Sequence, residues 1–357
     1  MGSKRIYHYH VNIHFKGNGL AYRIGRRTSE YVGSQGFKDT FVFFQKSCGL
    51  VLSRTRLYAD GEILSKASNS VNTQIIKALL CYYALSADFP LIDSMSIVRK
   101  KAGQPDYAYT ECDRIHQPIG KSINRTLFCT QNVLDVLLQE TPKGQTIRIA
   151  MSYWLKGIAS NDVYYKFDHL WRAFNRLYMY QGNAAIENEC MRVMRTFILS
   201  NSSHFSQSIS ITNAYTNDVL HSFRWSRMIL NDYDTRNKTK ALVEFVQRYH
   251  DGRIMNLLKE KLTCRNNYIN APTNPQDYRA MIDNHINNNL HTTVDAELVT
   301  LLSIKYAYFV RNKMFHGEIA DGTFKVKLNN LDNEMKLLDD LLEVLVLELI
   351  ENHQLFR

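Results

Sequence analysis

Three polar side chains close to one helix end have the residue types and spacing for chemistry on a phosphate. The stretch FVRNKMFHGE places Arg311 directly before Asn312 and puts His316 five positions after the arginine. An imidazole can transfer a proton near neutral pH, a guanidinium can stabilise charge on phosphoryl oxygens, and an amide can orient either group. These residues are therefore the candidate catalytic residues of the chain.

The residues before this stretch predict the helix that carries it. Its start is expected near Thr293, whose hydroxyl could cap the first turn, and Gly317 is suited to end it. An apolar stripe at helical spacing predicts its buried face, made of Leu298, Leu302, Tyr306 and Phe309. His316 then lies in the last turn, where the free carbonyl groups favour a charged imidazolium.

Helix geometry allows Arg311, Asn312 and His316 to form one site but does not require it. On a regular helix Asn312 and His316 share a face, while Arg311 lies about 140° round the axis from His316 and about 7.5 Å along it. A long guanidinium can still reach the same groove, above all one formed against a second helix. Taken alone, such residues at a helix end are most often surface and capping groups.

The first 145 residues predict an α+β domain. Alternating or β-branched segments predict strands, and two apolar-periodic segments predict helices. The strands are expected at 5–15, 20–27, 39–47, 49–59 and 91–100, and the helices at 69–87 and 130–140. A turn is expected at Asp60 and Gly61, and the run Pro142, Lys143 and Gly144 is expected to end the domain.

Residues 146–357 predict an all-α helical bundle. Apolar residues recur at helical spacing over 163–178 and over 331–349, the second pattern being the seam of a helix that packs along a partner. Further helices are expected around 184–199, 215–230, 237–262 and 276–289. A bundle accounts for all of these segments.

Positive charge is concentrated in the first region. Of the net charge of +10, residues 1–150 carry +9, from 20 Lys and Arg against 11 Asp and Glu, and residues 151–357 carry +1, from 24 against 23. This asymmetry is typical of a protein that binds a polyanion, although a basic surface also keeps a protein soluble. The candidate RNA-binding residues are Arg26, Arg27, Arg54, Arg56, Lys100 and Lys101.

No metal or cofactor is expected. His8, His10 and His14 share one face of a strand, and two histidines at such spacing can chelate zinc. No acidic or thiol partner is marked out for them, however, and pairing with neighbouring strands explains them equally well. The six cysteines are scattered without a C-x-x-C pair, so we expect reduced thiols.

The chain has no pattern of a membrane or exported protein. The most apolar segment, 337–350, is interrupted by Asp339, Asp340, Glu343 and Glu348. The N-terminus begins with charge and then a strand pattern rather than an apolar signal core. We therefore expect a cytoplasmic protein with no membrane partner.

The string RNKMFH, Arg311 to His316, resembles the R-x4-6-H motif of HEPN-domain ribonucleases, including the polar residue after the arginine. The stretch LWRAFNRLY, Leu170 to Tyr178, is similar to the first-helix pattern of these proteins, and an amphipathic helix after the motif is also expected. The resemblance covers residues 155–357 and says nothing about residues 1–150.

This resemblance implies a metal-independent endoribonuclease of the bacterial toxin or anti-phage defence kind. Arg311, Asn312 and His316 would be its catalytic residues, RNA its substrate, and an antitoxin or trigger molecule an unidentified partner. One histidine cannot easily serve as base and acid on opposite sides of an in-line displacement. The family implies the solution, a homodimer formed by the helical domain whose composite site holds two copies of the motif.

Two other functions stay open. A HEPN-like bundle can be a non-catalytic module for dimerisation and for binding nucleic acid or nucleotide. Alternatively, the chemistry could lie in the N-terminal half, at the strand of histidines, with the bundle as a dimerisation platform.

Overall fold

The computed structural model describes residues 6–357 with the exception of 22, 35, 67, 102–106, 111–115, 120–126, 275 and 318–329. The chain forms two compact units. The sheet unit contains Met1–Asn161, Arg172–Tyr180 and Leu349–Arg357, and the helical unit contains Asp162–Trp171 and Gln181–Glu348. The predicted order, an α+β region followed by a mostly helical one, is confirmed.

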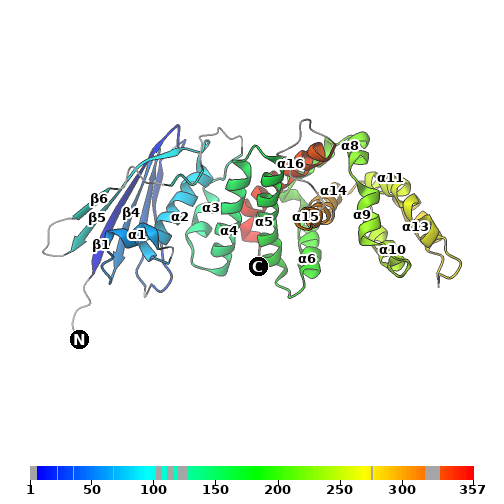
Figure 1. Ribbon diagram of the computed structural model, residues 1–357, viewed down its shortest axis with the longest axis horizontal. Helices are drawn as coiled ribbons and strands as arrows, with labels where there is room; N and C mark the ends of the chain where they lie inside the picture. The colour runs from blue at the N-terminus through cyan, green and yellow to red at the C-terminus, as the bar shows by residue number, and fades with distance from the viewer. Residues whose placement is uncertain are drawn as a thin grey trace. The chain divides into compact units, whose positions relative to one another are not determined.

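An antiparallel sheet of six strands forms the sheet unit's framework (Figure 1). The strands are β1 (Tyr7–Lys16), β2 (Ile24–Ser29), β3 (Asp39–Phe44), β4 (Ser47–Arg54), β5 (Leu91–Lys101) and β6 (Tyr107–Thr110). Their order is β2-β3-β4-β1-β5-β6, so β1 lies between β4 and β5. Alternation or β-branched and aromatic content predicted the first five strands, whereas β6 has only four residues and gives no periodic pattern.

One face of this sheet is packed and the other is open. Along β1, Tyr9, Val11, Ile13 and Phe15 are buried, while the residues between them are exposed or half-buried. The buried side packs on α2 (Ser70–Leu85), whose predicted helix is confirmed, and Phe15 stacks on Tyr82 at 3.8 Å between ring centroids. Within the sheet unit, α2 lies against this side of the sheet (Figure 1).

The predicted turn at Asp60 and Gly61 is wrong. These residues begin a short helix, α1 (Asp60–Ser65), which leads into α2. Asn69 caps α2, because its side-chain oxygen accepts hydrogen bonds from the backbone N–H groups of Val71 and Asn72 at 2.8 and 3.4 Å.

The run Pro142, Lys143 and Gly144 begins a helix instead of separating two domains. After α3 (Asn132–Leu138), the side chain of Thr141 accepts from Gly144 N at 3.0 Å and caps α4 (Pro142–Ile158). Proline is well tolerated in a first turn, where its missing N–H has no intrahelical partner. The expected boundary after residue 145 therefore falls inside α4, and the sheet unit continues to Asn161.

Helices make up the second unit. They are α5 (Val163–Gly182), α6 (Glu187–Ser200), α7 (Ser206–Asn213), α8 (Asn217–Ser222), α9 (Trp225–Asp232), α10 (Thr239–Gln247), α11 (Gly252–Lys261), α12 (Asn266–Ile269), α13 (Tyr278–Asn289), α14 (Asp295–Thr300), α15 (Ala307–Phe315) and α16 (Asn330–Glu351). Both α5 and α16 also contribute residues to the sheet unit.

The two predicted stripes on the longest helices are buried almost throughout. The buried members are Phe167, Leu170, Trp171, Phe174, Leu177 and Tyr178 on α5, and Met335, Leu338, Leu342, Leu345 and Leu349 on α16. Two predicted helices are broken, at Phe223 between α8 and α9 and at Asp251 before α11, because both residues have extended backbones. Among the described residues, no helix is long and apolar enough to cross a membrane.

Candidate functional site

The candidate motif lies on a helix whose pitch changes before the motif. Residues 295–315 run through α14, a π-helical segment η4 (Leu301–Tyr306) and α15 without interruption. The predicted stripe of Leu298, Leu302, Tyr306 and Phe309 is at most 1% exposed, so the buried face is confirmed. The wider turn of a π segment rotates the residues after it relative to those before it. The direction in which the Arg311 side chain points therefore differs from that expected if α14 continued as a regular α-helix.

The start of this helix is anchored by a buried acid rather than by the expected cap. Val294, not Thr293, is the N-cap residue, and its backbone N–H donates to Oδ2 of Asp251 at 2.9 Å. Burial alone raises the pKa of Asp251, but its hydrogen bonds and ion pair with Arg253 and its bond from Val294 lower it overall. The prediction of a Thr293 cap is thus wrong, since a carboxylate from another part of the chain supplies the acceptor.

The end of the π segment is held by Tyr306. Its hydroxyl accepts from the backbone N–H of Arg224 at 2.8 Å, and Arg224 also forms an ion pair with the buried Glu334 of α16 at 2.7 Å. Burial, together with the neighbouring Glu334, raises the pKa of Tyr306 well above its usual value. The phenol therefore stays neutral and fixes α15 against the α8–α9 connection.

Tyr308 supports the motif helix from the other side. Its ring lies 6.1 Å from that of Trp171 on α5, and its hydroxyl donates to Glu187 of α6 at 3.4 Å. Because Trp171 belongs to the stretch LWRAFNRLY, that segment contacts the helix that carries the motif.

The side chain of Arg311 is held by neutral partners. Its Nη1 donates to Oδ1 of Asn312 at 2.9 Å, and its Cζ lies 4.3 Å from the centre of the Phe315 ring. Its Nε is buried and has no hydrogen-bond partner, and no described acidic side chain forms an ion pair with it. The sequence analysis missed Phe315, although its position four residues after Arg311 on one helix could have indicated the contact.

His316 lies just beyond the last residue of α15, on the surface. Its backbone N–H donates to the carbonyl of Asn312 at 3.0 Å, and its side chain is exposed. Gly317 follows with φ of 68°, and its N–H donates to Met314 O at 3.0 Å, which ends the helix as predicted. The structure thus joins Arg311 to Asn312, while the described contacts do not join the imidazole of His316 to either.

This arrangement places a cation and a proton-transfer group on the same helix end. The guanidinium carries positive charge that no described carboxylate neutralises, and the imidazole is accessible to a ligand from solvent. Both groups can act on a phosphate that approaches the exposed end of α15.

Arg54 must be removed from the predicted RNA-binding residues. It is 3% exposed, its two terminal nitrogens donate to the carboxylate of Asp39 at 2.7 and 2.8 Å, and its guanidinium stacks on Tyr31 at 3.8 Å. Arg54 is the last residue of β4, and the chain leaves the strand before Arg56. A buried, bidentate pair is a structural contact and is closed to phosphate.

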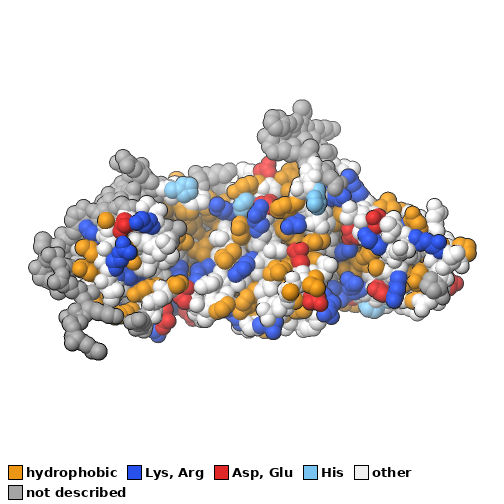
Figure 2. All heavy atoms as spheres, turned by 60° about the horizontal axis from the view of Figure 1, so that its bottom comes forward, with side chains coloured by type: hydrophobic (Ala, Val, Ile, Leu, Met, Phe, Trp, Pro, Cys, Tyr) orange, Lys and Arg blue, Asp and Glu red, His pale blue; other side chains and the backbone are white. Residues whose placement is uncertain are grey.

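The other predicted RNA-binding residues differ in how accessible their side chains are to a phosphate. Arg26 donates to Thr40 at 2.9 Å, Arg27 lies 3.6 Å from Asp135, and Arg56 is exposed beside Glu62 at 3.7 Å. Lys100 is exposed on β5, and the side chain of Lys101 lies outside the described residues. On the face seen in Figure 2, Lys and Arg side chains are spread among apolar and polar ones rather than gathered in one patch.

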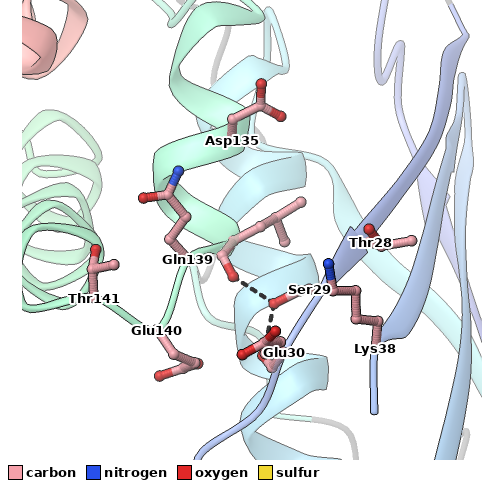
Figure 3. A pocket seen from close by; sticks show the side chains of 9 residues that line it. Thr28, Ser29, Glu30, Lys38, Asp135, Gln139, Glu140 and Thr141 are labelled. Atoms are coloured by element: carbon pink, nitrogen blue, oxygen red, sulfur yellow. Dashed lines mark hydrogen bonds between the residues drawn. The ribbon is translucent and has the colours of Figure 1, made fainter. Parts of the chain in front are cut away.

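A polar cavity of about 510 Å³ lies in the sheet unit between β2 and the α3–α4 connection (Figure 3). Beside it, Lys77 donates to Ser29 Oγ at 3.2 Å and to Glu30 O at 3.0 Å, and forms an ion pair with Glu140. Burial lowers the pKa of Lys77, whereas Glu140 raises it. Ser29 itself donates to backbone carbonyls.

This cavity is a poor candidate for phosphate or for nucleophilic catalysis. Its lining includes the carboxylates of Glu30, Asp135 and Glu140, with Lys38 as the one basic residue among the described lining residues. Burial lowers the pKa of Lys77 overall. Its amine donates to the Ser29 hydroxyl and forms an ion pair with Glu140, so it is not placed to take a proton from Ser29.

Metal ligands do not cluster in the described part of the chain. No group of three or more His, Cys, Asp or Glu side chains there could hold a metal ion, and this includes the histidines of β1. The alternative of a zinc-dependent N-terminal enzyme therefore gains no support. No family model, curated protein or solved structure matches this chain, so the function is inferred from its own residues.

Proposed function

We propose that this protein is a metal-independent endoribonuclease of HEPN type that cleaves RNA at Arg311, Asn312 and His316. The observation that carries the proposal is Arg311, a sheltered guanidinium held by neutral groups beside an exposed imidazole. The contact between Trp171 and Tyr308 supports it further, because it joins the stretch LWRAFNRLY to the helix that carries the motif.

The reaction uses the nucleophile that RNA itself carries. The 2′-oxygen loses its proton to a base and attacks the adjacent phosphorus, forming a new P–O bond while the bond from phosphorus to the 5′-oxygen breaks. Arg311 stabilises the charge on the non-bridging oxygens, and an imidazolium returns a proton to the departing 5′-oxygen. The products are a 2′,3′-cyclic phosphate and a 5′-hydroxyl.

A second copy of the chain completes the site. In-line displacement requires proton transfer on opposite sides of the phosphorus, and one motif offers a single imidazole. A two-fold axis beside the exposed end of α15 would supply a second His316 and a second Arg311 without new sequence. In this arrangement one histidine acts as the base and its copy acts as the acid.

The remainder of the chain would supply RNA binding and control. The sheet unit, which contains the strongly basic first 150 residues, binds RNA. Its proposed contacts with RNA phosphates are Arg26, Arg27, Arg56, Lys100 and Lys101. A cytoplasmic role as a toxin or anti-phage effector, restrained by an antitoxin or released by a trigger, is part of the same proposal.

Incubation with total RNA in EDTA tests the proposal. Wild-type protein should yield fragments that end in 2′,3′-cyclic phosphate and begin with a 5′-hydroxyl. His316→Ala should reduce the rate by about 10²–10⁴-fold, the usual worth of a positioned acid or base. His291→Ala, an exposed histidine of the same unit, is the matched control. Undiminished cleavage by His316→Ala would remove the motif from the mechanism, and RNA binding without cleavage by wild type would favour the non-catalytic module.

Subunit mixing tests the shared site. After exchange has been demonstrated with tagged chains, an excess of His316→Ala protein should lower the activity per wild-type chain, because impaired heterodimers form. Unchanged activity per wild-type chain, or a monomer at active concentrations, would contradict the composite site.

A further inference from the structure

The open face of the sheet carries three histidines in a row on its central strand. His8 and His14 are exposed and His10 is half-buried, and all three alternate with the buried residues of β1. Same-face residues two apart on a strand are separated by about 7 Å. The row therefore extends for about 20 Å across the middle of the sheet.

Serines face both ends of this row on the neighbouring strands, while Val51 and Val98 lie opposite His10. On β4, Ser53 lies opposite His8 and Ser47 lies opposite His14. On β5, Ser94 lies opposite His14 and Lys100 lies opposite His8. His8 Nδ1 lies 3.0 Å from Ser53 Oγ, within hydrogen-bonding distance.

Charge on this face is positive. Strands β1 and β4 contain no acidic residue, and β5 contains only Asp93, which lies at a bulge and pairs with Lys16 at 2.9 Å. Lys100 is the charged residue directly opposite the histidine row on its two neighbouring strands. Protonation of the imidazoles adds further positive charge to this face.

We propose that this open face binds single-stranded RNA, with His8, His10 and His14 as its central contacts. An imidazole ring stacks on a nucleobase in either protonation state, and an imidazolium also binds phosphate. A flat, open sheet accepts unpaired bases, whereas a duplex presents mainly its backbone. Phe44, which is 37% exposed at the end of β3, lies on the same face, with the Arg23 guanidinium over its ring at 4.8 Å from the centroid.

This binding depends on pH in a defined direction. Histidine changes its charge between about pH 5 and 8. Among the described residues of β1 and β5, the charged groups next to the row are Lys100 opposite His8 and the paired Lys16 and Asp93 at its end. Acidification therefore adds phosphate-binding charge. Affinity for RNA should rise as the pH falls from 8 to 6.

The inference deepens the proposed RNA-directed function and can be tested apart from cleavage. Binding of fluorescein-labelled oligouridylate is measured by anisotropy with full-length His316→Ala protein in EDTA, at pH 6 and pH 8 and over a series of salt concentrations. In that background, joint replacement of His8, His10 and His14 by Gln should weaken binding at pH 6 about tenfold and abolish the pH dependence. The slope of log affinity against log salt should fall by about 2, since each phosphate contact on a single strand contributes about 0.7.

A gain-of-function variant distinguishes a specific loss of RNA binding from a loss caused by misfolding of the variant. Replacement of the same three histidines by Lys should give affinity at pH 8 equal to that of the parent at pH 6, while His291→Gln should change nothing. Equal binding by the triple Gln variant, no gain by the triple Lys variant, or stronger binding of duplex than of single-stranded RNA would overturn the proposal. Binding to anionic vesicles without binding to RNA would likewise assign the face to a different partner.

Cleavage of a dinucleotide separates this inference from the nuclease proposal. A dinucleotide is too short to need a binding face 20 Å long. Cleavage of a dinucleotide by wild type therefore tests the motif residues, while the anisotropy measurement in the His316→Ala background tests the face without any cleavage. Failure of wild type to cleave any RNA would refute the nuclease proposal and leave the binding result standing.

Discussion

Two arginines, Arg54 in the sheet unit and Arg311 in the helical unit, differ in what holds their charge. In the sheet unit, Arg54 and Asp39 neutralise each other through two hydrogen bonds, and Gln74 donates to the same carboxylate at 2.7 Å. In the helical unit, Arg311 is held by an amide and an aromatic ring, and both carboxylate oxygens of the buried Asp339 lack a hydrogen-bond partner.

The difference distinguishes arginines that hold a fold from arginines that are available to a ligand. A buried pair is costly to break, since removal of one partner leaves the other charge in a medium of low dielectric constant. A guanidinium positioned by neutral groups keeps its net charge for an incoming phosphate. Sequence alone does not separate the two cases, because both arginines stand beside polar residues.

The largest expected effect is on the stability of the sheet unit. Arg54→Met should lower the free energy of unfolding by about 3–5 kcal/mol, because the carboxylate of Asp39 is then buried without a cation. Arg56→Met, at an exposed arginine two residues on, should change it by less than about 0.5 kcal/mol. Urea denaturation followed by circular dichroism measures both. A stable Arg54→Met protein would show that the pair contributes little, and the added replacement Asp39→Leu should restore most of the loss.

Arg311 should show the opposite pattern, with a large effect on activity and a small one on stability. Arg311→Lys should reduce RNA cleavage about 10²–10³-fold, because an ammonium cannot both bond Asn312 and stack flat on Phe315. Its free energy of unfolding should stay within about 0.5 kcal/mol of wild type. The control is Arg236→Lys, at an exposed arginine of the same unit. If Arg311→Lys instead unfolds the helical unit, the side chain is structural and the contrast with Arg54 fails.

Asp339 should make the helical unit less stable as the pH rises. Burial raises its pKa to about 9, with Asp340, Glu343 and Asp162 adding to the effect and Lys166 opposing it. Above about pH 4 the unfolded chain releases this proton while the folded chain keeps it, so stability falls from there to about pH 9. The slope from this group is at most about 1.4 kcal/mol per pH unit.

Replacement of this carboxyl tests the effect. Asp339→Asn should raise the melting temperature at pH 8 and flatten the dependence of stability on pH, while Asp340→Asn, at the exposed neighbour, should do neither. An unchanged pH profile in Asp339→Asn would mean that the carboxyl finds a partner in solution.

The smallest expected effect concerns the surface charge of the sheet unit. Joint replacement of Arg26 and Arg27 by Glu should lower the salt slope of RNA binding by about 1, since each contact on a single strand contributes about 0.7 and Arg27 is partly offset by Asp135. The matched pair Arg236→Glu and Lys238→Glu in the helical unit should have little effect. Equal losses from the two pairs would show that the excess charge of the first region serves solubility alone.

Much of the fold follows from periodicity. The alternation along β1 and the apolar stripes of α5 and α16 identify their buried faces, because a strand repeats every two residues and a helix every 3.6. The end of the motif helix at Gly317 follows from the ability of glycine to adopt a positive φ. These features are local, so residue order suffices to predict them.

Other features depend on contacts between distant residues. The partner of Arg54 is Asp39, fifteen positions earlier on β3, and that pairing removes this arginine from the RNA-binding set. The cap of the motif helix comes from Asp251, forty-three residues before Val294, and the π segment after α14 determines where Arg311 points. Sequence determined which residues can do chemistry and which faces are buried. Tertiary structure decided which charges are neutralised, because that depends on which side chains the packed elements bring within hydrogen-bonding distance.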